Sequence, residues 1–82
     1  MSDTVTVVRR IGVAPRARGC STDWNCPDIF ELSDGQFAII GTDRTASLQK
    51  LLPSDAGLAD DERIVVITRE TMLRARADIP LF

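Results

Sequence analysis

The chain has 82 residues, of which 44% are hydrophobic and 27% charged, and its formal net charge is −2. This length suffices for one domain, spanning residues 1–82, and the hydrophobic fraction is typical of a globular rather than a disordered chain. The small negative charge excludes a general attraction to nucleic acid, and no apolar run reaches the roughly 20 residues of a transmembrane helix. The first residues lack a basic segment followed by an apolar one, so we expect a cytoplasmic protein that does not bind membranes.

Residues 4–11 are rich in β-branched side chains and predict a first strand. Arg9 interrupts the apolar alternation. Val5, Val7 and Ile11 therefore share one face only if the strand contains a local irregularity.

Residues 12–27 contain glycine, proline, serine and aspartate, which predicts an irregular loop with Arg16 and Arg18 in solvent. Pro27 has no N–H to donate to a ladder of strands. It therefore suits the start of the next strand.

The central feature is a hairpin with strands at about 29–33 and 36–41, joined at Asp34-Gly35. Asp-Gly between apolar runs is typical of a two-residue type I′ turn. This turn pairs Leu32 with Phe37 and Phe30 with Ile39, so that four large apolar side chains share one face. The outer face then carries Ser33, Glu31 and Ala38, with Ile29 and Ile40 at its far end.

The second half of the chain predicts two short helices and one more strand. Residues 45–52 form one or two helical turns that end at Pro53, and residues 53–62 form an acidic surface loop. Residues 63–68 form a strand whose apolar run indicates cover on both faces. Thr68 caps a helix from Arg69 to about Ala77, with Met72, Leu73 and Ala75 toward the core and Arg69, Arg74 and Arg76 outward.

These elements indicate the α+β class: a small, mainly antiparallel sheet built on the central hairpin, with one or two short helices. An all-β fold is the alternative if the middle helix is only a turn. A core this small is marginal, so oligomerisation or partner binding would be a natural supplement.

Cys20 and Cys26 have five residues between them, whereas zinc-binding pairs usually have two to four and a second pair elsewhere. The chain has no histidine, no third cysteine and no Cys-x-x-Cys motif. We interpret the two cysteines as free thiols in a reducing cytoplasm. An intra-loop disulfide and a metal site shared across a dimer are the alternatives, in that order.

Catalytic constellations are missing from the sequence. Without histidine, Ser-His and Cys-His dyads are excluded within the chain, and the scattered glycines form no phosphate-binding loop. The acids near the hairpin are typical of turns and solvated faces. We therefore expect no catalytic residue, no metal site and no cofactor.

Four arginines precede the hairpin, and they are candidates for phosphate contact: Arg9, Arg10, Arg16 and Arg18. The aromatic side chains that a single-strand binder would add are missing from this segment. A solvated arm, or one that pairs with acids elsewhere in the chain, is the favoured interpretation. Trp24 is either a core residue or an interface anchor.

The segment around the hairpin resembles a family of small actinobacterial regulators typified by the BldB developmental protein. The shared features run in the same order along both sequences: Ser21, Asn25-Cys26, Ile29-Phe30-Glu31-Leu32, Asp34-Gly35, Phe37-Ala38-Ile39-Ile40 and Asp43-Arg44. The family's closing Phe and Trp are replaced here by residues 68–73. The resemblance implies a non-enzymatic protein that binds partners, such as helix-turn-helix transcription factors, and that self-associates.

The leading hypothesis is a small cytoplasmic regulatory or accessory protein that acts by protein–protein contact, with a homodimer as one form. The expected contact residues are Trp24, Glu31 on the outer hairpin face, and Arg69, Arg74 and Arg76 on the last helix. The alternatives are a nucleic-acid-binding module that uses the N-terminal arginines, and a metal or redox protein that uses Cys20 and Cys26.

Overall fold

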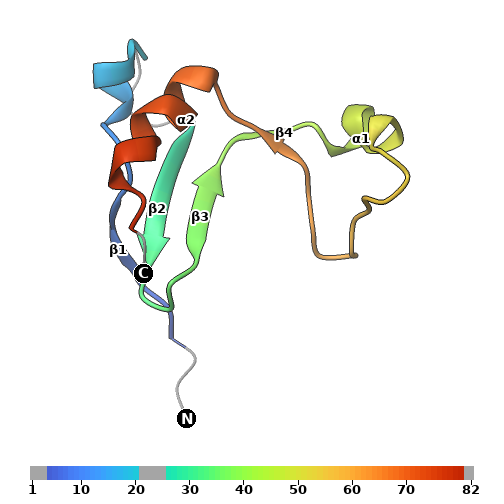
Figure 1. Ribbon diagram of the computed structural model, residues 1–82, viewed down its shortest axis with the longest axis horizontal. Helices are drawn as coiled ribbons and strands as arrows, with labels where there is room; N and C mark the ends of the chain where they lie inside the picture. Colours follow the sequence, from blue (N-terminus) through green and yellow to red (C-terminus); the bar gives the residue numbers. More distant parts are fainter. Residues whose placement is uncertain (1–3, 21–25, 81–82) are drawn as a thin grey trace.

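The structure is a computed structural model that describes residues 4–20 and 26–80. Its main element is a three-stranded antiparallel sheet in the order β1–β2–β3, formed by β1 (Val7–Arg10), β2 (Asp28–Leu32) and β3 (Phe37–Ile40) (Figure 1). A short 3-10 turn, η1 (Pro15–Arg18), interrupts the loop predicted at residues 12–27. The sheet and the short helices confirm the predicted α+β class.

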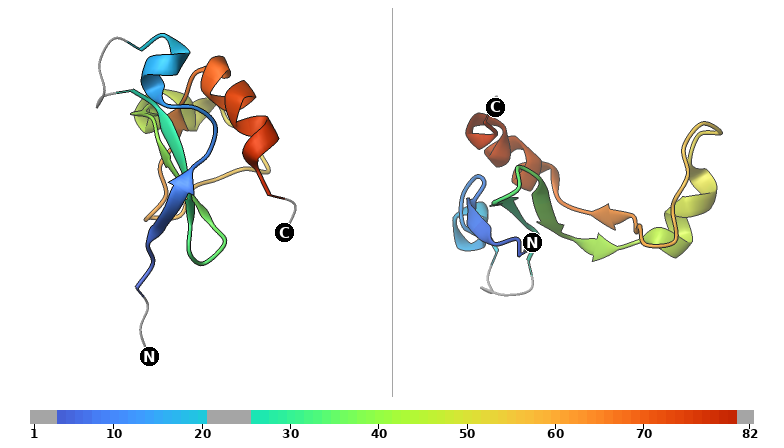
Figure 2. Two further views of the ribbon diagram at one scale, coloured as in Figure 1. Left: turned by 90° about the vertical axis from the view of Figure 1, so that its left-hand side faces the viewer. Right: turned by 90° about the horizontal axis from the view of Figure 1, so that it is seen from below.

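After β3 the chain leaves the sheet and returns to it. β4 (Thr42–Asp43) pairs antiparallel with β5 (Val65–Val66), and α1 (Thr45–Leu48) and η2 (Gln49–Leu51) lie between these strands in sequence. We call residues 41–66 the arm and the other described residues the body. Figure 2 shows the arm projecting away from the sheet, and the radius of gyration of 14.5 Å exceeds the roughly 12 Å of a compact chain of this length.

Helix α2 (Arg69–Ala75), continued by η3 (Arg76–Asp78), packs on one face of the sheet (Figure 1). The core between them consists of Ile11, Ile29 and Ala75, with Ile67 packed against it. Ala75 is fully buried, and the lack of a larger side chain lets the helix approach the sheet closely.

The N-terminus of α2 is capped as predicted: the Thr68 hydroxyl accepts a hydrogen bond from the Thr71 N–H at 3.1 Å. The predicted core face of the helix is wrong except at Ala75. Met72 and Leu73 are each 52% exposed, while Thr71 is buried. Because residues four apart share a helix face, the burial of Thr71 and Ala75 turns Met72 and Leu73 toward solvent.

The hairpin has a three-residue loop instead of the predicted two-residue turn. The Leu32 N–H donates to the Gln36 carbonyl at 2.9 Å, and the Gly35 N–H donates to the Leu32 carbonyl at 3.1 Å. Gly35 has a φ of +88°, whereas Asp34 keeps a negative φ, so the loop matches a type I turn closed by a left-handed glycine. The Asp34 carboxylate accepts one hydrogen bond from the backbone N–H of Gln36 and a second one from the Gln36 side chain. Both bonds lower the pKa of Asp34, and the backbone bond has the larger effect.

The longer loop shifts the register by one residue, which corrects the predicted pairs and faces. Ile29 lies opposite Ile39, and Phe30 lies opposite Ala38. Since opposed residues share a face, Ile29 and Ile39 lie on the side of the sheet covered by α2, and Phe30 lies on the open side. The predicted cluster of four apolar side chains on one face is therefore split between both faces.

The irregularity expected in the first strand is confirmed. Val7 pairs with Leu32 and Arg9 with Glu31, so Val8 is an extra residue that bulges from β1. The strand is shorter than the predicted residues 4–11. As expected, Pro27 stands directly before β2.

The arm has a shorter strand, with less cover on its side chains, than the sequence predicts. The two helical turns at 45–51 are confirmed, but residues 63–68 form only the two-residue β5, whose Val65 and Val66 remain exposed. The start of α1 is fixed by Asp43, whose carboxylate accepts one hydrogen bond from the Thr45 hydroxyl and another from the Thr45 backbone N–H. Both bonds lower the pKa of Asp43, and the hydroxyl bond has the larger effect.

Gly41 links the body to the arm. A Cβ at this position would lie 2.7 Å from the Val66 carbonyl oxygen and 3.0 Å from a methyl carbon of Ile67. Gly41 therefore allows the two segments of the chain at the root of the arm to lie in direct backbone contact.

We predict that Gly35→Ala lowers the free energy of unfolding by about 1 kcal/mol, because a Cβ disfavours its left-handed conformation. No atom lies within 4 Å of the added Cβ, so the change isolates the backbone cost. Gly57→Ala is the matched control: it also has open space and lacks a positive φ. Urea unfolding of both variants measures the difference, and equal stabilities would contradict the assigned turn.

Candidate functional site

Arg10 is held by internal contacts on the open face of the sheet. Its guanidinium forms a two-pronged pair with Asp28, with Nε to Oδ1 at 3.0 Å and a terminal nitrogen to Oδ2 at 3.0 Å. Asp28 is only 5% exposed, and the Arg10 guanidinium also lies over the Phe30 ring, 5.4 Å from its centre. Arg10 therefore neutralises a buried carboxylate.

Arg9 points to the opposite side, where the end of η3 meets the sheet. Its Nε donates to the Glu31 carboxylate at 2.9 Å, and a terminal nitrogen donates to the Asp78 carbonyl at 2.8 Å. The Asp78 carboxylate in turn accepts the Gly12 N–H at 2.9 Å. Glu31, an expected contact residue, thus already has a partner within the chain.

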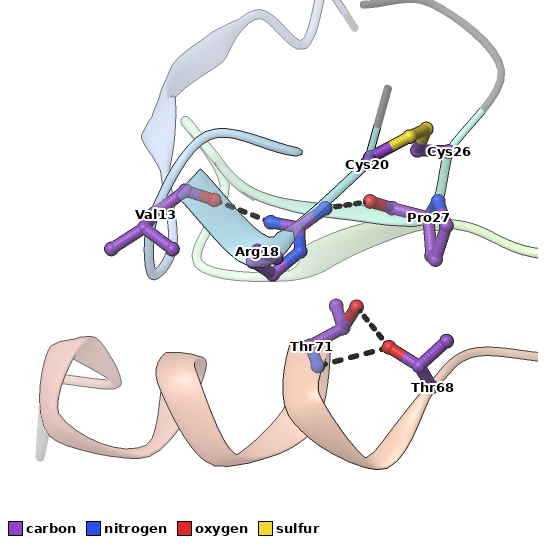
Figure 3. The surroundings of a disulfide bond; sticks show 7 residues. All are labelled: Val13, Arg18, Cys20, Cys26, Pro27, Thr68 and Thr71. Carbon is purple, nitrogen blue, oxygen red and sulfur yellow. Dashed lines mark hydrogen bonds between the residues drawn. A yellow bond between two sulfur atoms is a disulfide. The ribbon is translucent and has the colours of Figure 1, made fainter. Parts of the chain in front are cut away.

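A shallow hollow of about 280 Å³ lies where the loop before β2 faces the start of α2 (Figure 3). Arg18 reaches across it and donates to the carbonyls of Val13 and Pro27. The expectation that Arg18 lies in solvent is wrong, because this guanidinium ties the two ends of the loop together. Arg16 is exposed, as expected.

The other polar groups of the hollow are also engaged. The hydroxyls of Thr68 and Thr71 lie 2.7 Å apart and share a hydrogen bond. The described residues that line it include no carboxylate, and the chain has no histidine, so none of these lining residues is a general base for either hydroxyl. Within the described residues, no three metal-ligating side chains gather into a metal site.

Cys20 and Cys26 form a disulfide at the rim of this hollow (Figure 3). The preferred interpretation as free thiols is therefore wrong, and the disulfide alternative applies. Disulfides are most common in oxidising compartments. The cytoplasmic location stays a prediction, and within the described residues no helix is long and apolar enough to cross a membrane.

The C-terminal contact residues expected from the sequence lie on the outside of α2 and η3. Arg69 and Arg76 are exposed, and Arg74 forms an ion pair with Glu70 at 2.5 Å, one helical turn away. Trp24, the remaining contact residue, lies outside the described residues.

The main feature that sequence reasoning missed is how much apolar surface stays exposed. The accessible surface is 6492 Å², whereas a folded chain of 9.0 kDa exposes about 4,900 Å². Among the described residues, the exposed large apolar side chains fall on β1, β3, the arm and α2, or directly beside β1 and η3: Val5, Val7, Val8, Phe37, Ile39, Ile40, Leu51, Val65, Val66, Met72, Leu73 and Ile79.

Comparison with protein-family models, with curated proteins and with solved structures found no match to this chain. The resemblance to the BldB-type regulators therefore stays a prediction from the hairpin residues.

We predict that Arg10→Met lowers the free energy of unfolding by about 2 kcal/mol, because it leaves the buried Asp28 carboxylate without its main partner. Arg9→Met is the matched control. Its pair with Glu31 is more exposed, and we expect a loss of about 1 kcal/mol or less. Chemical unfolding at neutral pH compares the two, and a larger loss for Arg9→Met would contradict the assigned roles.

We predict that the native chain has no titratable thiol until a reductant is added, after which two react. Replacing both cysteines with serine should lower the free energy of unfolding by about 2 kcal/mol, as the chain-entropy model gives for so short a loop. The control is the reduced wild type, whose free energy of unfolding should match that of the double variant. Two reactive thiols without reductant would contradict the disulfide.

Proposed function

We propose that the protein is a small non-enzymatic regulatory or accessory protein that acts by binding another protein. The observation that carries the proposal is the outer face of α2, where Met72 and Leu73 are half-exposed next to Arg69 and Arg76. Methionine and arginine are both enriched at protein–protein interfaces relative to the rest of the surface.

The chemistry of this face favours one class of partner. Met72 is unbranched and adaptable, so it suits an apolar surface that is not fixed in advance. The arginines around it favour carboxylates at the rim of the partner. We therefore expect a protein surface with an apolar centre and acidic edges. A transcriptional regulator is the class that the resemblance favours.

The alternatives have less support. Of the N-terminal arginines, Arg9, Arg10 and Arg18 are bound to groups of the chain itself, so phosphate contact would require breaking these bonds. The disulfide removes both cysteines from the set of metal ligands. These observations disfavour the nucleic-acid and metal hypotheses.

The test is affinity capture from the native lysate, followed by titration of the purified captured protein. We predict that Met72→Glu weakens binding at least tenfold, because it places a charge at the centre of the contact. Val5→Glu is the matched control, since it changes an exposed apolar residue just before β1, away from α2, in the same way. Equal binding by both variants, or no stoichiometric partner, would refute the proposal.

A further inference from the structure

The outer edge of β3 has unused backbone hydrogen-bonding groups. The bond from the Leu32 N–H to the Gln36 carbonyl fixes which pairs of the hairpin are hydrogen-bonded. By the alternation of an antiparallel ladder, the N–H and C=O groups of Phe37 and Ile39 then point away from β2. Within the described part of the chain, no strand pairs with this edge.

The two edges of the sheet differ in how they are protected. β1 carries the bulge at Val8 and the charged residues Arg9 and Arg10, which are features that discourage strand addition. β3 reads Phe-Ala-Ile-Ile, without charge, proline or bulge, and Ile39 and Ile40 are both exposed. An apolar edge without these features is a site for pairing with another strand.

The amount of exposed surface fits a second copy of the chain. The surface exceeds that of a compact chain by about 1,600 Å², whereas each partner in a standard interface buries about 800 Å². The surplus is therefore larger than the area that one partner buries in a standard dimer contact.

The arm lies on the side of β3 where the second copy would be. Figures 1 and 2 show it leaving the end of β3 and extending away from β2. It carries exposed Leu51, Val65 and Val66 and the acidic residues 55–62. These apolar side chains therefore lie on the same side of β3 as the second copy.

We propose that two copies of the chain pair antiparallel through the outer edges of β3. The two sheets join into one, with the two-fold axis perpendicular to it, so that both α2 helices lie on the same face. The arm of each copy then lies beside the β3 edge of its partner. The inference rests on the proposed role in protein contact but uses a different surface from Met72 and Leu73.

The test is the molar mass of the full chain by light scattering and sedimentation across a concentration series. We expect a dimer, and we expect Ile39→Lys to raise its dissociation constant by about a hundredfold, because it places a charge beside the paired edges. Val7→Lys is the matched control, since it adds the same charge to an exposed residue on the opposite edge. A monomeric wild type, or equal effects of both variants, would overturn the proposal.

Amide hydrogen exchange of the wild type keeps the proposal testable if Ile39→Lys fails to fold. We expect the Phe37 and Ile39 amides to be protected, with protection lost on dilution, although neither amide faces a partner strand among the described residues. Rapid exchange at all concentrations would overturn the pairing. A monomer that still binds its partner through Met72 would refute this inference and leave the proposed function intact.

Discussion

The whole body depends on the close packing of Ala75 against Ile11 and Ile29. These three residues are the buried apolar core of the described chain, and a core of this size contributes little against the entropy of ordering 82 residues. Polar contacts supplement it on both faces of the sheet: Arg9 ties the end of η3 to the sheet, and on the open face Arg10 compensates the charge of Asp28. The disulfide closes the loop that precedes β2. The unusually small core and the large apolar surface have a common explanation if part of the core forms only when a partner is bound.

Much of the local structure could be predicted because it depends on neighbours in sequence. The cap at Thr68, the helical turns of the arm and the irregularity near Arg9 all follow from short-range patterns. The hairpin was found, but its register was not. Both two-residue and three-residue loops need a left-handed glycine, so Gly35 suits either one, and the hydrogen bond from Gln36 to Asp34 favours the longer loop. A shift of one residue exchanges the faces of every side chain on β3 relative to β2.

The candidate site was less predictable, because its residues meet only through tertiary contacts. Which acid pairs with Arg9 or Arg10 follows from the register of β1 against β2. Hydrophobicity favoured Met72 and Leu73 as core residues, but the space above Ile29 fits the smaller Ala75. The Cys20–Cys26 spacing allows free thiols or a disulfide, and only the path of the loop brings the two sulfurs together. The burial of Ala75 depends on how closely the helix approaches the sheet, and the sequence does not show this distance.

The backbone contact at Gly41 has a consequence for how this chain can evolve. A side chain at position 41 would collide with the Val66 carbonyl, so only glycine fits there. This one position therefore constrains the angle between the arm and the body. Residues further out on the arm are free of this restriction, because most are exposed. The tip can therefore drift in sequence while its direction stays constant, which would let related chains change what they bind without rebuilding the sheet.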